Sequence, residues 1–331
     1  MYLKPTSVHT IPVNPSTLRG KEPQSLSANK HDFPGKNSNR KLVFLFNHAM
    51  GYHKEVFHPI MKRFLDQLRN QREYDQTDIT FISWDDRHHG ESARLNEGCL
   101  SDDHSTTDSA LDTKQVIDFF DSKAKYDLFL GVGHSLGAKS LLLCDYYFPG
   151  TFNGLFLIEP VVYATMKEAM SIASVVAKNF RKRPEEWEKA EEFRESFLSK
   201  NIYKAFHPEV LELYANYGLY KTDKHTYKLK CTRRSEEVVF GNSFKDSYIC
   251  SKAIGELTIP TQFILGTKSF FAASEFWKTS PKLNNNLFKK DVLKGTHLLP
   301  YEQPDAVIPY LMNLTNRVAT TREKSFFKAM I

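Results

Sequence analysis

The sequence predicts an α/β protein with a mostly parallel, doubly wound sheet that is interrupted by an inserted helical cap. Short apolar runs typical of buried strands alternate with amphipathic helical segments, which is the pattern of successive βα units. The alternation stops between residues 161 and 257, where helical segments with a charged face dominate, and then resumes. We therefore expect an N-terminal extension over residues 1–40, a core in two parts (41–160 and 258–331), and a cap over residues 161–257.

The expected elements follow from the period of the apolar residues. The strand-like runs are residues 41–49, 78–86, 126–132, 152–160, 259–267 and 287–295. Residues 55–70 and 111–123 carry apolar side chains at helical spacing. Residues 14–40, rich in Pro, Ser, Asn, Lys and Gly, predict a loose connection. Charges of mixed sign over residues 178–195 predict an exposed helix, and the tail after Arg317 either is mobile or packs as a last helical turn.

Composition excludes several classes of protein. The net charge of +6 comes from basic residues that are scattered or mixed with acids, so we expect no nucleic-acid partner. No apolar stretch approaches the ~20 residues of a membrane span, and the N-terminal residues carry no apolar signal segment. The four cysteines have neither metal-ligand spacing nor disulfide density, so a cytoplasmic protein without metal or cofactor is expected.

The stretch Gly133-His134-Ser135-Leu136-Gly137 has the spacing G-x-S-x-G of a nucleophile elbow, a sharp turn from strand to helix with a serine at its tip. The strand-like run 126–132 precedes it, and residues 138–148, with apolar side chains at helical spacing, follow it up to Pro149-Gly150. The context therefore favours Ser135 as a nucleophile. The alternative is a serine that only caps a helix.

A serine hydroxyl needs a base to take its proton. In enzymes with this elbow the catalytic residues follow the chain order serine, acid, histidine. His297 lies in a Gly-Thr-His turn after the last strand-like run and before a helix expected near Pro304, so it is the expected base.

An oxyanion that develops during acyl transfer needs hydrogen-bond donors, each worth ~2.7–4 kcal/mol of transition-state stabilisation. One expected donor is the backbone N–H of Leu136, directly after the serine. The other is expected in the loop after the strand 41–49, at the N–H of Met50 or of its neighbour Ala49. His48 in the same loop is expected to order the loop.

The triad acid is harder to place. Its usual position follows the strand 259–267, where residues 266–269 are Gly-Thr-Lys-Ser and offer no carboxylate. Glu275 lies further on, at the expected start of a helix. Glu159 closes the apolar strand after the elbow helix, where an unpaired carboxylate is costly to bury. We therefore predict Glu159 as the acid. Two alternatives are that Glu159 caps the start of the inserted helical segment or that it pairs with an arginine.

Five motifs follow one another over roughly residues 40 to 315: HAMGYHKEVFHP, WDDRHHGESARLN, VGHSLG, LIEPVV and FHPEVLELYANYGL. Together they resemble fungal α/β-hydrolases of the toxin-biosynthesis type and the yeast peroxisomal lipase-like hydrolase. The resemblance implies an α/β-hydrolase fold with a helical cap and a Ser-His-carboxylate triad, carried here by Ser135, His297 and Glu159. In the second motif, Asp86, His89, Gly90 and Ser92 are expected to brace loops near the site.

These residues predict a serine hydrolase, lipase-like or esterase-like, that cleaves a small-molecule carboxylic ester or thioester through an acyl-enzyme. A serine at the elbow argues against dehalogenase or epoxide-hydrolase chemistry, which uses an aspartate there. Two alternatives stay open: a catalytically silent binding protein of the same fold, and an acyltransferase that uses the same residues. The C-terminal residues 329–331 are not a Ser-Lys-Leu-type address, so the peroxisome is only the alternative location.

Overall fold

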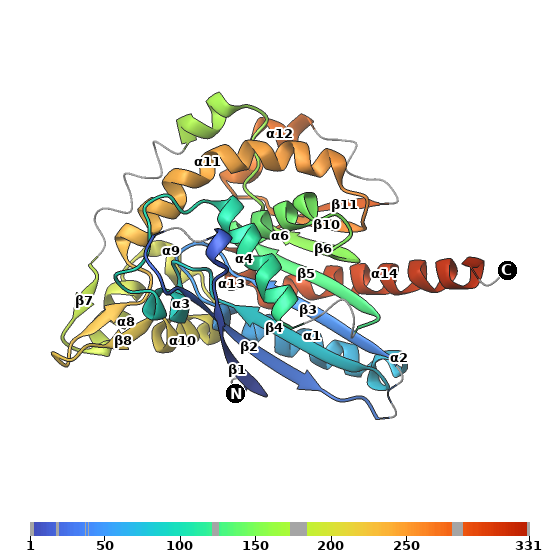
Figure 1. Ribbon diagram of the computed structural model, residues 1–331, viewed down its shortest axis with the longest axis horizontal. Coiled ribbons are helices and arrows are strands. Elements are labelled where there is room, and N and C mark those ends of the chain that lie inside the picture. Colours follow the sequence, from blue (N-terminus) through green and yellow to red (C-terminus); the bar gives the residue numbers. More distant parts are fainter. Residues whose placement is uncertain are drawn as a thin grey trace.

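A computed structural model of the 331-residue chain describes residues 3–17, 20–36, 38, 40–120, 126–172, 184–279 and 287–329. An eight-stranded sheet runs through the molecule in the order β1-β2-β4-β3-β5-β6-β10-β11 (Figure 1). Its strands are β1 (Ser7–Pro12), β2 (Ser25–Phe33), β3 (Lys41–Asn47), β4 (Asp78–Trp84), β5 (Leu128–His134), β6 (Gly154–Ile158), β10 (Thr261–Gly266) and β11 (Phe288–Leu293). β2 pairs antiparallel with β1 and β4, whereas all other neighbours are parallel. The mostly parallel α/β fold predicted from the sequence is confirmed.

Side chains alternate along the central strands and build a separate apolar cluster on each face of the sheet. Along β3, Phe44 and Phe46 belong to one cluster, and Val43 and Leu45 belong to the other. Successive strand residues point to opposite faces, so one continuous apolar run supplies both clusters. Helices α1 (His58–Arg69) and α14 (Ile308–Ala329) cover the face with Phe44.

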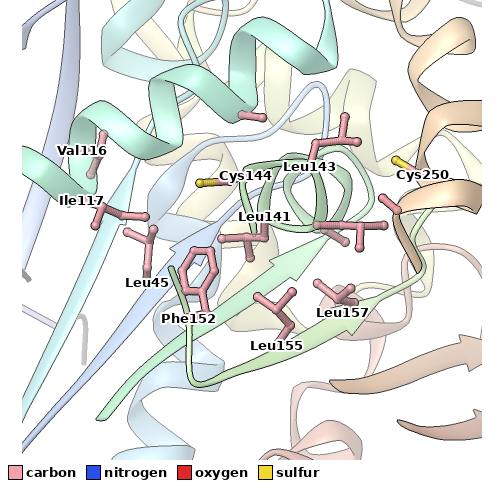
Figure 2. Close-up of a cluster of buried hydrophobic side chains, with 14 of the residues drawn as sticks. Leu45, Val116, Ile117, Leu141, Leu143, Cys144, Phe152, Leu155, Leu157 and Cys250 are labelled. Atoms are coloured by element: carbon pink, nitrogen blue, oxygen red, sulfur yellow. The ribbon is translucent and has the colours of Figure 1, made fainter. Parts of the chain in front are cut away.

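The opposite face is covered by α4 (Thr106–Phe119) and α6 (Leu136–Tyr147), with α11 (Arg233–Glu256) packed on α6. Figure 2 shows Leu141 of α6 between Ile117 of α4 and Leu155 of β6, all fully or nearly fully buried. The helix predicted from residue 111 begins earlier, because Ser105 and Asp108 form a capping box that starts α4 at Thr106. The last part of the predicted segment, residues 121–123, lies outside the described residues.

The N-terminal region departs from the sequence-based expectation. Residues 14–40 were expected to form a loose connection, but residues 25–33 form β2, which is hydrogen-bonded between β1 and β4. The apolar side chains Leu26 and Ala28 are fully buried in the core. Polar residues alternate with these apolar ones, so the composition of this segment does not indicate a strand. Residues 7–12 and 25–33 therefore extend the core sheet and are not an appendage to it.

The insertion contains more than helices. A three-stranded antiparallel sheet, β7 (Glu186–Trp187), β9 (Tyr227–Leu229) and β8 (Leu219–Lys221), accompanies α8 (Ala190–Leu198), α9 (Asn201–Lys204), α10 (Pro208–Tyr217) and α11. The helix predicted over residues 178–195 is wrong at 186–187, which pair with β9, and begins only at Ala190. Residues 178–183 lie outside the described part. The C-terminal half of α11 places Cys250 and Ile254 in the core cluster under α6, so a cap ending at residue 257 includes core residues.

The remaining elements are short. They are the helices α2 (Arg72–Asp75), α3 (Gly90–Leu95), α12 (Glu275–Thr279) and α13 (Leu299–Glu302), and the 3-10 helices η1 (Pro15–Thr17), η2 (Lys54–Phe57), η3 (Phe271–Ala273) and η5 (Pro304–Val307). The tail after Arg317 continues α14 to Ala329 (Figure 1). None of the helices in the described ranges is long and apolar enough to cross a membrane.

Candidate active site

Ser135 lies at the tip of a strained turn between β5 and α6. Its backbone has φ 52° and ψ −109°, a conformation that side-chain-bearing residues rarely adopt. A Cβ on Gly133 would meet the Gly137 carbonyl oxygen at 2.7 Å, and one on Gly137 would meet the Asn47 carbonyl oxygen at 2.1 Å. Both glycines are therefore required by close backbone approach. This is the geometry that the G-x-S-x-G spacing predicts.

His297 reaches Ser135 from the loop that follows β11. Its Nε2 lies 2.8 Å from the Ser135 hydroxyl oxygen, within hydrogen-bond distance. The loop is held by Glu302, which accepts a 3.0 Å bond from the Thr296 amide and a second bond from the Thr296 hydroxyl. Burial lowers the pKa of His134 well below its usual value, and the Nε2 of this neutral ring lies 2.8 Å from the His297 carbonyl oxygen.

Glu159 lies on the other side of the His297 ring. One carboxylate oxygen is 2.9 Å from His297 Nδ1, so the contact predicted between these two residues is present. Glu159 directly follows β6, has φ 52°, and is fully buried. Glu275, the other carboxylate considered, lies elsewhere, and its amide donates to Glu168 at 3.0 Å. The carboxylate of Asp246 accepts bonds from Thr107.

Ser269 has a role that the sequence interpretation missed. Its hydroxyl donates to the same carboxylate oxygen of Glu159 that His297 contacts, while the Gly266 amide donates to the other oxygen. Residues 266–269, where an acid is usual, thus supply donors to a carboxylate carried by the neighbouring strand. β6 and β10 are paired, which brings the two strand ends together. A small hydroxyl residue at the position of the missing acid is the sequence signal for this arrangement.

The two residues whose amides are expected to form an oxyanion hole line the same cavity as Ser135. Met50 and Leu136 both line it, and neither amide donates to another described residue. Leu136 is the first residue of α6, so its N–H has no partner within the helix. The Ala49 amide, by contrast, is directed at the Tyr301 hydroxyl, 3.4 Å away. Of the two candidates in this loop, Met50 is therefore the one whose amide has no acceptor among the described residues.

His48 orders the loop that carries Met50. Its Nδ1 lies 2.8 Å from the Ala49 carbonyl oxygen, and its Nε2 accepts a 3.0 Å bond from the Asp86 amide. Burial, together with the neighbouring His89, lowers the pKa of His48 to about 4, so the ring is neutral near neutral pH. With both nitrogens occupied, His48 connects this loop to the one that carries Asp86, which fits the predicted loop-ordering role.

Residues 85–92, in the motif WDDRHHGESARLN, brace the same region. His89 Nδ1 lies 3.1 Å from an Asp86 carboxylate oxygen, and the Ser92 hydroxyl donates to the Asp85 carbonyl at 2.6 Å. A Cβ on Gly90 would meet the Asp85 carboxylate at 2.3 Å. The sequence interpretation missed the central ion pair: Asp85 accepts bonds from the amide and the ammonium of Lys54, at 2.7 and 2.6 Å.

A cavity of about 430 Å³ opens at Ser135 and His297. Most of its lining is apolar or aromatic. The lining residues from the core and the cap include Val161, Tyr163, Tyr203, Tyr214, Phe240, Phe244, Phe270, Phe271 and Leu298. Tyr203, Tyr214 and the residues of α11 come from the inserted segment, so the insertion forms part of the wall. Within the described residues, no group of three or more His, Cys, Asp or Glu side chains is arranged to hold a metal ion.

Comparison with known proteins identifies the fold. The peroxisomal α/β-hydrolase Lpx1 of Saccharomyces cerevisiae superposes with a TM-score of 0.76 over 96% of this chain and 87% of that one, at 20% identity. E-2-(acetamidomethylene)succinate hydrolase superposes with a TM-score of 0.69 over 94% of this chain and 100% of that one, at 17% identity. The chain therefore has the α/β-hydrolase fold. No protein family model matches it.

The chain also matches curated proteins in sequence. A type I acyl-CoA thioesterase of Penicillium brevicompactum is 28% identical over 123 residues, which are 37% of this chain and 27% of that protein. The peroxisomal membrane protein LPX1 of Saccharomyces cerevisiae is 31% identical over 126 residues, 37% of this chain and 31% of that protein. The chain thus matches less than a third of the length of these curated relatives. The resemblance indicated by the sequence motifs is confirmed.

Proposed function

We propose that this protein is a serine hydrolase that cleaves a small carboxylic ester or thioester through an acyl-enzyme. The observation that carries the proposal is the chain of contacts from Ser135 to His297 at 2.8 Å and from His297 to Glu159 at 2.9 Å, at the mouth of a cavity. A nucleophile, a base and an orienting carboxylate in mutual contact is the arrangement that activates a serine.

In the first half of the reaction, the Ser135 oxygen attacks the acyl carbonyl carbon while His297 Nε2 takes the hydroxyl proton. The carbonyl oxygen becomes an oxyanion, and the amides of Leu136 and Met50 donate to it. Glu159 holds the proton on His297 Nδ1 and stabilises the imidazolium. When the tetrahedral intermediate collapses, His297 returns its proton to the departing alcohol or thiol, and the acyl group stays on Ser135.

In the second half, a water molecule enters at the position of the leaving group. His297 Nε2 takes a proton from this water as its oxygen attacks the acyl carbon, and the same two amides stabilise the second oxyanion. Collapse releases the carboxylic acid and returns the proton to the Ser135 oxygen. An acyltransferase would differ only in the molecule that enters at this point.

The substrate class is supported by the relatives. One is named as an acyl-CoA thioesterase and another structure is a thioesterase domain from the curacin biosynthetic pathway, with a TM-score of 0.62 over 93% of this chain. The apolar and aromatic cavity lining suits an acyl chain. We therefore include thioesters as well as oxygen esters in the proposed class.

The proposal is tested with a fluorophosphonate probe, which reacts with activated serines. The probe should label the wild-type protein and leave the Ser135→Ala variant unlabelled. A matched control is Ser140→Ala, since Ser140 lies on the same helix but lines no part of the cavity around Ser135. It should be labelled like the wild type.

Two results would contradict this assignment. Labelling that survives in Ser135→Ala would place the nucleophile elsewhere. A folded wild-type protein that neither reacts with the probe nor hydrolyses any acyl ester would favour a silent binding protein.

We propose the cytoplasm as the location, with the peroxisome as the alternative that the name of the yeast relative suggests. Fluorescent fusions at either end of the chain, imaged together with a peroxisomal marker, distinguish the two locations.

A further inference from the structure

Lys139 is a buried cation inside the cavity that contains Ser135. It lies four residues after Ser135, one turn into α6, and its side chain lines the cavity beside Ser243 and Ser247 of α11. The residue is only 3% exposed. A lysine at a buried helix position is unusual, because removing an ammonium group from water is costly unless a partner compensates for it.

The hydrogen bonds of Lys139 use only two of the three N–H donors of its ammonium group. Its ammonium group donates to the Ser247 hydroxyl at 3.0 Å and, over a longer distance of 3.4 Å, to the Ser243 carbonyl. An ammonium group has three N–H donors, so one has no acceptor among the residues that the structure describes. No described carboxylate lies within 4.0 Å of the ammonium nitrogen.

Two carboxylates lie in this region, and neither is within 4.0 Å of the Lys139 ammonium nitrogen. Asp246, one residue before Ser247 on α11, accepts bonds of 3.1 and 3.0 Å from the amide and hydroxyl of Thr107. Glu236 also lines the cavity, but one of its oxygens would be 2.5 Å from a Cβ on Gly51, beside the loop that carries Met50. Glu236 precedes Ser243 by two turns of α11, or about 10 Å along the helix axis. Glu236 thus lies near the proposed oxyanion site, whereas Lys139 lies against the later residues Ser243 and Ser247 of α11.

We propose that Lys139 is a specificity-determining residue that binds a carboxylate carried by the acyl group of the substrate. The inference rests on the proposed function of Ser135. A carboxylate supplies the missing acceptor and one negative charge, which matches the single charge of the lysine. A phosphate dianion would leave excess negative charge close to Asp246, which adjoins Ser247 on α11. The preferred substrates are thus esters or thioesters of dicarboxylic acids with one free carboxylate.

The location of Lys139 assigns the carboxylate to the acyl group and not to the leaving group. The leaving alcohol or thiol has to depart to solvent, and the exposed residues Lys268 and Phe270 mark the open side of the cavity near His297. Lys139 is buried, so a group bound there stays in place while water enters for the second half of the reaction. The acyl group, attached to Ser135, is the part that remains.

The test compares p-nitrophenyl esters in pairs of equal chain length: succinate with butanoate, adipate with hexanoate, and suberate with octanoate. The wild type should have the higher kcat/KM for the dicarboxylate ester in at least one pair. Lys139→Met, which keeps the length of the side chain, should lower that value roughly 10–100-fold, as expected for a hydrogen bond to a charged group, with little change for the partner ester.

Lys268→Met is the matched control, because Lys268 lines the same cavity and carries the same charge but is exposed. It should change the preference much less than Lys139→Met. If Lys139→Met does not fold, as judged by circular dichroism, Lys139→Gln replaces it. An equal loss for both esters of every pair would make Lys139 a structural tether between α6 and α11, and would overturn the inference.

A binding measurement separates this inference from the proposed function. In the Ser135→Ala background, monomethyl adipate should bind more tightly than methyl hexanoate in isothermal titration calorimetry, and Lys139→Met should remove the difference. Ester hydrolysis by the wild type without any dicarboxylate preference would overturn the role of Lys139 alone. A binding preference without any hydrolysis would overturn the proposed function alone.

Discussion

Glu159 receives three hydrogen bonds, from the Gly266 amide, the Ser269 hydroxyl and the His297 imidazole. A fully buried carboxylate is stable only when its oxygens accept such bonds. The donors also fix its orientation, so that one oxygen faces His297 Nδ1. At the scale of single residues, the site therefore depends on groups that do not touch a substrate.

Glu159→Gln is predicted to lower kcat strongly with little effect on KM. An amide oxygen can still accept one bond, but the charge that stabilises the imidazolium is lost, and the loss of such a partner can reduce kcat by ~10⁴. Steady-state kinetics on a p-nitrophenyl ester measure both parameters. Glu275→Gln is the control, since Glu275 is exposed and does not contact His297. Near-normal turnover by Glu159→Gln would contradict the role of this residue.

At the scale of elements, the insertion consists of two parts with different neighbours. Residues Trp187, Phe193, Phe197, Val210 and Tyr214 form an apolar cluster that packs on the loop of Ala49 and Tyr52. The second half of α11 belongs to the core instead. Only the first part can be removed without opening the core, and it contributes Tyr203 and Tyr214 to the cavity.

Replacing residues 188–226 with an Asn-Gly turn is predicted to leave a folded protein with altered substrate selectivity. Trp187 and Tyr227 are paired antiparallel in β7 and β9, so a two-residue turn can join them. Loss of Tyr203 and Tyr214 widens the cavity, so turnover should shift toward bulkier acyl groups. Turnover is measured across a panel of acyl esters, with a thermal melt to verify folding. A profile identical to that of the full-length protein would show that this segment does not determine specificity.

At the scale of the whole molecule, the fold buries histidines in their neutral form. Burial lowers the pKa of His48 to about 4 and that of His58 to about 3. A histidine whose pKa is lower in the folded state binds its proton more readily in the unfolded state. The folded state therefore loses stability as pH falls from about 6.5 toward the folded pKa. His89 acts in the opposite direction. Burial lowers its pKa, but Cys231 and Asp86 raise it by more, so the pKa of His89 lies well above its usual value.

His58→Leu is predicted to reduce the loss of stability on acidification. At about pH 5 the unfolded His58 is protonated while the folded one is not, which lowers the free energy of unfolding by about 2 kcal/mol relative to about pH 7.5. Neither ring nitrogen of His58 has a partner among the described residues, so leucine should be tolerated. Urea unfolding at both pH values measures the change.

The control is His225→Asn, because His225 is exposed and has a positive φ of 63° that asparagine tolerates. It should show the same pH dependence as the wild type. If His58→Leu also loses as much stability as the wild type between the two pH values, the neutral state assigned to His58 is wrong.

The main features of the fold were predictable because they depend on local patterns. Apolar runs such as residues 41–49 are long enough to identify buried strands, and the spacing of Gly133, Ser135 and Gly137 identifies the elbow. β2 was missed because its polar residues alternate with only a few apolar ones, so its composition resembles that of a loop. The strand at 186–187 was missed because a two-residue strand has no period to detect.

The sequence by itself determined the parallel α/β core, the strand-turn-helix around Ser135 and the contact partners His297 and Glu159, because each is marked by a short local motif or by the end of an apolar run. Only the tertiary structure decided which groups surround them. Ser269 meets Glu159 because β6 and β10 are paired. In the part of the chain that the structure describes, α11 presents serines and no carboxylate to Lys139. Such contacts join residues about a hundred positions apart, and pairings at that distance are set by packing and not by local sequence.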